Sequence, residues 1–266
     1  MSNKPVLLIR GTGNERDAAA FAALGIATVS EPFTDISAAD PHGAHELLRL
    51  LGRPNAWVIL TSRNALTFWA QSLAAGELHA AFTAHPTLKF AAVGVGTAEL
   101  LAQYGVTKVV TPQAPLEANS EGILSVLSEF PAGLALLPAG NLARQYLPEG
   151  LRLAGWQVES RVVYENKPLS VAPKSVSALC AGEFGAVVVR APSSVQALHH
   201  FLTARGFGEA SGFPISDVPL ICGGAQSAQC ARELGFQVAA TASDPSPEAI
   251  AELTRSTLAH IGGITS

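Results

Sequence analysis

The chain has 266 residues, of which 48% are apolar and 14% charged, and its formal net charge is −4. This length is sufficient for two domains of ordinary size, each with its own hydrophobic core. A slightly acidic chain without a block of basic residues does not favour nucleic-acid binding. No apolar run reaches the roughly 18 residues that a membrane span needs, and the first apolar run, Val6–Ile9, is too short for a secretory signal. We therefore expect a cytoplasmic protein without nucleic-acid or membrane partners.

Short apolar runs typical of buried strands alternate with segments of helical periodicity along the whole chain. We expect strands at residues 6–9, 26–29, 57–60, 90–93, 109–110, 134–137, 158–164, 187–189, 220–222 and 238–240. We expect helices at residues 15–24, 42–51, 64–73, 97–104, 120–127, 143–153, 194–205, 227–234 and 247–260. Gly25 and Gly105 are suited to end helices, and Ser120 and Ser246 to begin them. Continuous apolar strands alternating with helices predict an α/β fold of doubly wound parallel sheets.

The sequence also repeats itself at a spacing of about one domain. Gly94 and Thr97 recur as Gly224 and Ser227, each after 130 residues. Two similar domains imply a cleft between them, and ligands usually bind in such clefts. We therefore expect the two repeated turns to contact one ligand from opposite walls.

Glycine, hydroxyl and arginine residues follow the ends of the expected strands, where ligands bind in open α/β sheets. The candidates for binding are Arg10, Thr61, Ser62, Arg63, Asn64, Gly94, Gly96, Thr97, Arg190, Ser193, Ser194, Gly224, Gln226 and Ser227. These residue types suit an anion, because helix N-termini attract negative charge and arginine pairs with carboxylates. A structural role is the alternative at each position: tight turns for the two glycines, N-caps for Thr97 and Ser227, and surface charge for the arginines.

Other kinds of site find little support in the sequence. The cysteines, Cys180, Cys222 and Cys230, form no CxxC pair, and no histidine pair has carboxylate or cysteine neighbours at metal-ligand spacing. The glycine turns at 11–13 and 94–96 each lack the third glycine of a dinucleotide-binding fingerprint. We expect no metal and no nucleotide cofactor.

Several degenerate motifs occur in a fairly specific order and spacing. They are Thr61–Leu66, Val93-Gly94-x-Gly96-Thr97-Ala98, Ser120-Glu121-Gly122, Gly140-x3-Arg144-x2-Leu147, Gly155-x2-Val158, Val163-Tyr164-Glu165, Pro192-Ser193-x-Val195, Gly224-x-x-Ser227-Ala228 and Ser246–Ala249. In this order they resemble the uroporphyrinogen-III synthase family over essentially the whole chain. Three positions depart from the family pattern: Gly11 after Arg10, Arg190-Ala191 before Pro192, and Ala225-Gln226 after Gly224.

The resemblance implies two α/β domains joined by a two-stranded linker, the second domain being inserted into the first. The implied domains are 1–35 with 169–266, and 36–168, with linkers near 33–41 and 164–173. The implied enzyme is a cofactor-free, monomeric, cyclising hydro-lyase that converts hydroxymethylbilane to uroporphyrinogen III in haem biosynthesis. It would make at most transient contact with the preceding or following pathway enzyme.

By the same resemblance, Tyr164 is the candidate acid for departure of the substrate hydroxyl, and Arg144 joins the substrate-binding residues. The structural alternative for Tyr164 is a strand residue that lines the linker. Two other functions remain open from the residues alone: a non-catalytic two-domain protein that binds a small anion, and a nucleotide-dependent enzyme.

Overall fold

The computed structural model describes residues 4–10, 14–114, 116, 119–207 and 218–264. Its contacts divide the chain into two compact units. Unit 1 comprises Met1–Asp35 with Lys167–Ser266, and unit 2 comprises Ile36–Asn166. The resemblance placed the domain boundaries near residues 35 and 168.

Unit 1 is built on a five-stranded sheet with the order β10-β9-β8-β1-β2. Its strands are β1 (Val6–Ile9), β2 (Thr28–Glu31), β8 (Ala186–Val189), β9 (Leu220–Cys222) and β10 (Val238–Thr241). Neighbouring strands are parallel, and Ile9 of β1 lies opposite Val189 of β8. The carboxyl ends of these strands therefore lie along one edge of the sheet, called here the carboxyl edge.

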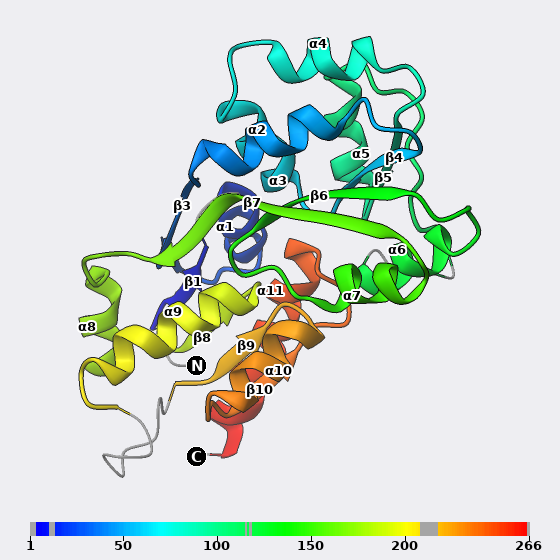
Figure 1. Cartoon of the computed structure of the whole chain (residues 1–266). Coiled ribbons are helices and arrows are strands. Elements are labelled where there is room, and N and C mark those ends of the chain that lie inside the picture. Colours follow the sequence, from blue (N-terminus) through cyan, green and yellow to red (C-terminus); the bar gives the residue numbers. More distant parts are fainter. Residues whose placement is uncertain (1–3, 11–13, 115, 117–118, 208–217, 265–266) are drawn as a thin grey trace. The chain divides into compact units, whose positions relative to one another are not determined.

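Helices cover both faces of this sheet (Figure 1). Leu7 and Ile9 belong to one hydrophobic core, and Val6 and Leu8 to another, because successive strand residues point to opposite faces. The first core is formed with α8 (Lys174–Cys180), α9 (Pro192–Thr203) and α10 (Ala225–Glu233). The second is formed with α1 (Asn14–Ala23) and α11 (Pro247–Ile264).

Unit 2 contains a five-stranded sheet with the order β3-β7-β6-β4-β5. Its strands are β3 (Thr34–Ala38), β4 (Ala56–Leu60), β5 (Lys89–Ala92), β6 (Leu134–Gly140) and β7 (Gln157–Pro168). The strands β5, β4, β6 and β7 run parallel to one another. Strands β3 and β7 also contain the two points at which the chain passes between units.

Trp57 and Ile59 of β4 lie in one core of unit 2, and Val58 and Leu60 in the other. Helices α6 (Ser120–Leu127) and α7 (Tyr146–Leu153) supply the first core. The second is formed with α2 (Pro41–Leu50), α3 (Arg63–Gln71), α4 (Glu77–Ala84) and α5 (Val95–Ala102). Both units thus have the doubly wound α/β architecture that the alternating sequence pattern predicts.

The strand orders explain how the sequence repeat relates to the units. Strands β9, β8, β1 and β2 of unit 1 correspond in order to β5, β4, β6 and β7 of unit 2. A parallel bridge between Ala91 and Val110 stands where unit 1 has β10. Each unit therefore combines a strand-helix-strand segment from one half of the repeat with the remaining strands of the other half.

Some local expectations differ from the structure. The α6 N-cap is Asn119, whose side chain accepts from Gly122 N, and not Ser120. The helix expected from residue 143 begins at Tyr146, and residues 109–110 contribute only a bridge. Helices α4 and α8 were not expected from the sequence.

The glycine and serine expectations at other helix ends are confirmed. Gly25 and Gly105 have φ values of 71° and 78°, the left-handed conformation that glycine adopts at little cost. The Ser246 hydroxyl accepts from Ala249 N at the start of α11.

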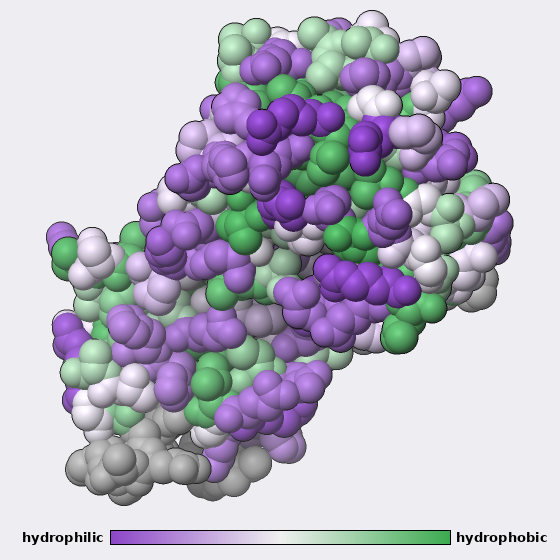
Figure 2. Space-filling view, in the orientation of Figure 1, coloured by the Kyte–Doolittle hydropathy of each residue, from purple (hydrophilic) through white to green (hydrophobic). Residues whose placement is uncertain are grey.

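Hydrophilic residues cover most of the face seen in Figure 2, with hydrophobic residues between them in smaller groups. Among the residues that the structure describes, no helix is both long and apolar enough to cross a membrane.

Candidate active site

Two arginines stand side by side at the carboxyl edge of unit 1. Arg10 directly follows β1 and Arg190 directly follows β8, and these two strands are neighbours in register. Asp17, on the first helix, lies between them: one carboxylate oxygen accepts from Arg10 and the other from Arg190. We call Arg10, Asp17 and Arg190 the Asp17 cluster.

The Asp17 carboxylate is nearly enclosed, with a side-chain exposure of 6%, whereas Arg10 and Arg190 retain 34% and 21%. Burial lowers the pKa of Arg190 and the charge of Arg10 acts in the same direction, whereas Asp17 and Glu248 raise it. Arg190 also donates to the backbone oxygen of Pro245, just before α11. The cluster is therefore fixed by contacts to a helix and a loop as well as to the strands.

The other strand-end residues of unit 1 lie at the starts of α9 and α10. Ser193 and Ser194 are half-buried in the first turn of α9, and Gln226 is exposed in the first turn of α10. The Ser227 hydroxyl is buried and donates to Gly224 O at 2.8 Å, so it is engaged within its own helix. Residues 11–13, the first glycine turn, lie outside the described residues.

The repeated turns do not have the structural roles considered for them, in which the glycines permit tight turns and Thr97 and Ser227 are N-caps. Gly94 and Gly224 are themselves the N-caps of α5 and α10, whereas Thr97 and Ser227 lie inside those helices. Gly94 has φ −152° and Gly224 has φ 171°, which is extended backbone that any residue can adopt. A Cβ atom on Gly224 would meet nothing within 4 Å. Local strain therefore does not explain the second glycine.

At the carboxyl edge of unit 2, the segment after β4 supplies several candidates. Ser62 is the N-cap of α3, and its hydroxyl oxygen accepts from Ala65 N at 3.1 Å. Thr61 and Arg63 are exposed and Asn64 is half-buried. A Cβ on Gly96 would lie 3.9 Å from Arg63 Cδ, which places Arg63 beside the turn after β5.

Tyr164 lies on β7 opposite Gly140, the last residue of β6, where the strand pairing is irregular. Its ring stacks on Phe68 with centroids 5.7 Å apart and an interplanar angle of 23°. Its hydroxyl oxygen is 3.4 Å from Ser62 Oγ. A Cβ on Gly140 would lie only 2.7 Å from Tyr164 Oη, so the ring occupies the space that glycine leaves open. We call Tyr164, Ser62, Phe68 and Gly140 the Tyr164 cluster.

Arg144 lies in the exposed segment between β6 and α7, with no ion-pair partner among residues for which the structure gives side chains. Arg63 likewise has no ion-pair partner among those residues. These two guanidinium groups therefore have their hydrogen-bond donors available at the carboxyl edge of unit 2.

Asp17, Phe68 and Gly140 are the residues that the sequence did not identify as site residues. Asp17 is an acidic residue in a first helical turn, a common position that normally indicates only a favourable helix dipole. Its contact with Arg190 spans 173 residues and depends on β1 lying beside β8. Only the strand order of the folded sheet reveals that contact.

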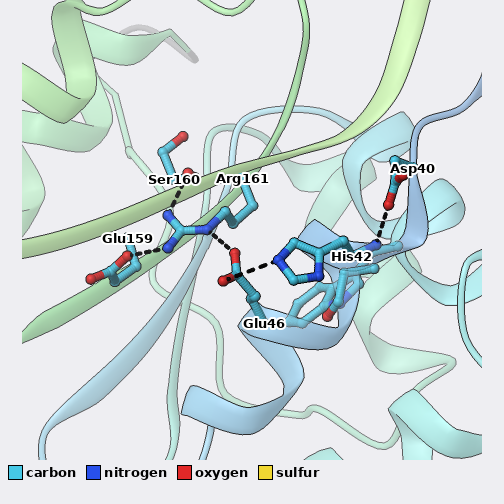
Figure 3. A network of polar contacts seen from close by, with 8 residues as sticks. Asp40, His42, Glu46, Glu159, Ser160 and Arg161 are labelled. Carbon is cyan, nitrogen blue, oxygen red and sulfur yellow. Dashed lines mark hydrogen bonds and ion pairs between the residues drawn. The ribbon is translucent and has the colours of Figure 1, made fainter.

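Arg161, in the middle of β7, is the centre of a different cluster (Figure 3). Its guanidinium group donates to Glu46 at 2.5 Å and to Glu159 at 2.8 Å, and His42 Nε2 lies 3.4 Å from Glu46. We call Arg161, Glu46, Glu159 and His42 the Arg161 cluster. A Cβ on Gly43 would lie 3.0 Å from Val162 O, so α2 lies directly against β7 at this point. This cluster joins a helix to a strand and lies away from the carboxyl edge.

The cysteines and histidines form no evident reactive site. Cys180, Cys222 and Cys230 are all free thiols, and burial raises the pKa of Cys222 to about 11. Within the described part of the chain, no group of three or more His, Cys, Asp or Glu residues could hold a metal ion.

Comparisons with known proteins agree with this architecture. A family model described as "Uroporphyrinogen-III synthase HemD" matches residues 15–252. A mutant uroporphyrinogen III synthase from the bacterium Thermus thermophilus is 16% identical, with 96% of this chain and 99% of that chain covered at a TM-score of 0.65. The uroporphyrinogen-III synthetase of Helicobacter pylori is 18% identical, with 95% and 99% covered at a TM-score of 0.59. At these identities the two crystal structures show a shared fold. No curated protein sequence matches the chain.

Proposed function

The chain belongs to the uroporphyrinogen-III synthase family, and we propose how its own residues carry out the reaction of that family. The enzyme is a cyclising hydro-lyase. It removes the terminal hydroxyl of the linear tetrapyrrole hydroxymethylbilane and closes the ring with inversion of the last pyrrole, which gives uroporphyrinogen III. The observation that carries this function is the family match over residues 15–252.

The substrate itself supplies most of the reactive groups. A pyrrole nitrogen stabilises the cation left when hydroxide departs, and a substituted carbon of the last pyrrole attacks it through a spiro intermediate. The protein must therefore hold the flexible chain in the conformation for this closure and must supply a proton to the leaving hydroxide. Without such positioning the chain closes without inversion to isomer I.

We propose Tyr164 as the proton donor. A phenol, with an ordinary pKa of about 10, is a suitable acid for a leaving hydroxide. The stacking of Phe68 and the space above Gly140 support this role, because they hold the ring at the carboxyl edge.

Ser62 completes this arrangement. Its oxygen already accepts from Ala65 N, so its own hydrogen can be donated to Tyr164 Oη, 3.4 Å away. A donor at this point leaves the phenolic proton for the substrate and stabilises the phenolate that forms when this proton is transferred.

The eight carboxylates of the substrate require cationic and N–H donors. We propose the exposed Arg63 and Arg144 as carboxylate-binding residues in unit 2, and Arg10 and Arg190 in unit 1. The starts of α3, α5, α9 and α10 add backbone N–H groups, because the first turn of a helix lacks the full set of acceptors within the helix and attracts anions. Thr61, Asn64, Ser193, Ser194 and Gln226 stand at or beside these helix starts and would add neutral donors.

We also propose that the enzyme acts in the cytoplasm as a monomer and receives hydroxymethylbilane from the preceding pathway enzyme. The polyanionic substrate is water-soluble, which supports this location. Sedimentation analysis at micromolar concentration tests the monomer, and a stable dimer would contradict it.

The decisive assay uses the purified protein with hydroxymethylbilane generated in situ, after which the oxidised products are separated into isomers I and III. An excess of isomer III over the protein-free control is expected. A mixture identical to that control would contradict the enzyme function and would support the alternative, a protein that binds a small anion without catalysis.

The acid role is tested with Tyr164→Phe, which keeps the ring and its stacking but removes the proton. The expected kcat falls about 100-fold, the usual contribution of a general acid. Tyr104→Phe, in the same unit and packed against Phe82, is the matched control and should retain the wild-type rate. Wild-type kcat in Tyr164→Phe would exclude Tyr164 as the acid.

A further inference from the structure

Asp17 is the only charged residue among the buried polar side chains of the described chain. Enclosing a carboxylate is costly unless the charge is paired and hydrogen-bonded. Both of its oxygens accept from guanidinium groups, so this requirement is met. These two contacts account for the burial of the Asp17 carboxylate. A single arginine, however, would already have balanced its negative charge.

The second arginine gives the cluster one excess positive charge among its three members. Arg10 and Arg190 occupy equivalent places after neighbouring parallel strands, so their like charges would repel each other without Asp17. Glu248, in the first turn of α11, is exposed and acts on Arg190 through its charge without forming an ion pair in the described structure. Two guanidinium groups and one carboxylate, with a summed charge of +1, therefore stand together at a sheet edge where ligands bind.

We propose that Asp17 is a positioning residue that holds Arg10 and Arg190 together as one binding site for a carboxylate of the substrate. This inference rests on the proposed function, because it takes the substrate to be a polycarboxylate. Asp17 does not touch the substrate in this account. It fixes the spacing and orientation of two guanidinium groups, which would otherwise be long, mobile side chains that repel each other.

The geometry supports this role in two respects. The carboxylate engages each arginine through a different oxygen, so it sets the distance between the two guanidinium groups. The arginines keep about a third and a fifth of their side-chain surface exposed, whereas Asp17 keeps almost none. A ligand can therefore contact the arginine side chains, whereas the Asp17 carboxylate is almost closed to it.

The test compares Asp17→Asn and Asp17→Glu with Glu46→Gln, which removes a carboxylate from the Arg161 cluster. Asp17→Asn keeps the shape but cannot hold two guanidinium groups, so KM for hydroxymethylbilane should rise about tenfold with kcat nearly unchanged. Asp17→Glu keeps the charge and should recover part of this loss. Glu46→Gln should keep the wild-type KM.

If Asp17→Asn does not fold, Asp17→Glu alone decides, because its longer side chain should shift the two guanidinium groups and raise KM. A wild-type KM in Asp17→Asn, or in Asp17→Glu where Asp17→Asn does not fold, would overturn the proposal. A lower KM in Asp17→Asn would also overturn it, since that result means that Asp17 withholds the arginines from the substrate.

Isothermal titration with uroporphyrin III, which carries eight carboxylates, separates this inference from the proposed function. Failure of the wild-type protein to form isomer III would contradict the enzyme assignment and would leave the titration valid. A Kd about tenfold weaker for Asp17→Asn than for wild type supports the positioning role. Equal or tighter binding by Asp17→Asn overturns it.

Discussion

The carboxyl edges of the two sheets share one strand order but carry different side chains. In unit 1 the residues after β1 and β8 are arginines joined by a buried carboxylate. In unit 2 the corresponding strands β6 and β4 end beside Gly140 and Ser62, two uncharged residues that contact Tyr164 of the neighbouring strand β7. The duplicated scaffold has therefore kept its architecture, while the buried carboxylate that joins two arginines at one edge has no counterpart among the residues around Tyr164 at the other.

The Arg161 cluster also contains an arginine paired with carboxylates, but it differs from the Asp17 cluster in its charge balance and in its position in the fold. There, two carboxylates surround one guanidinium group, and all three side chains are about a third exposed. The Asp17 cluster has the reverse composition and a buried centre. One cluster joins a helix to a strand, whereas the other gathers two guanidinium groups around one carboxylate at a sheet edge.

The largest effect on folding is expected from Asp17→Ala. Removing the carboxylate takes from two partly buried cations the counter-charge that they share, which costs about 3 kcal/mol of unfolding free energy. Glu46→Ala, in the exposed Arg161 cluster, should change stability far less. Urea unfolding followed by circular dichroism measures both variants.

Tryptophan fluorescence supplies an internal control, because Trp57, Trp69 and Trp156 all lie in unit 2. The fluorescence transition should move less than the dichroism transition in Asp17→Ala. Equal stability of Asp17→Ala and Glu46→Ala would remove the distinction drawn between the two clusters.

A smaller effect is expected from Gly140→Ala at the edge of unit 2. The added methyl group meets the Tyr164 ring and hydroxyl, so the ring must move, with a stability loss of about 1–3 kcal/mol. We expect kcat to fall about tenfold because the proton donor is displaced. For stability, Gly224→Ala is the matched change, since its methyl group has open space. Unchanged kcat in Gly140→Ala would show that the position of Tyr164 is not critical.

Ser62→Ala should have a smaller effect again, and it combines two losses. The variant loses the α3 N-cap, worth about 1 kcal/mol, and the contact with Tyr164. Asn119→Ala removes the side-chain cap of α6 in the same unit, where Asn119 accepts from Gly122 N at 2.8 Å. Both variants should lose similar stability, but only Ser62→Ala should lower kcat, by a few-fold. Equal kcat values would confine Ser62 to its capping role.

The sequence was sufficient for the α/β class and most elements because these depend on local signals. Alternating apolar runs place β1, β4 and β8, and glycines at positive φ end several helices. Helix α4 was missed because it follows α3 after a short turn and has Gly76 as its N-cap, without a side-chain cap. Arg144 was expected in a helix and lies before it, since α7 begins only at Tyr146.

The site was less accessible to sequence reasoning because its contacts join distant segments. Strand-end position correctly placed Arg10 and Arg190 at one sheet edge, but their common partner, Asp17, depends on the adjacency of β1 and β8. The repeated Thr97 and Ser227 suggested caps or ligands, whereas the Ser227 hydroxyl binds its own backbone. Repetition in sequence thus indicated equivalent folds without indicating equivalent chemistry.

The smallest expected effect concerns the acid stability of the Arg161 cluster. The hydrogen bond from Arg161 lowers the pKa of Glu46 below its usual 4.5, despite some opposition from burial. A carboxylate with a lowered folded-state pKa stabilises the protein above its unfolded-state pKa, and this contribution is lost as pH falls through the folded-state value. Glu46→Gln should therefore lose thermal stability less steeply than wild type below about pH 4.5, as measured by tryptophan fluorescence.

Glu31→Gln is the comparison in unit 1. Burial would raise the pKa of Glu31, but hydrogen bonds from Ser175 and Lys174 lower it. The loss of stability of Glu31→Gln in acid should therefore also be less steep, as measured by circular dichroism. An acid profile of Glu46→Gln parallel to wild type would mean that Arg161 binds Glu46 no more strongly in the folded protein than solvent does.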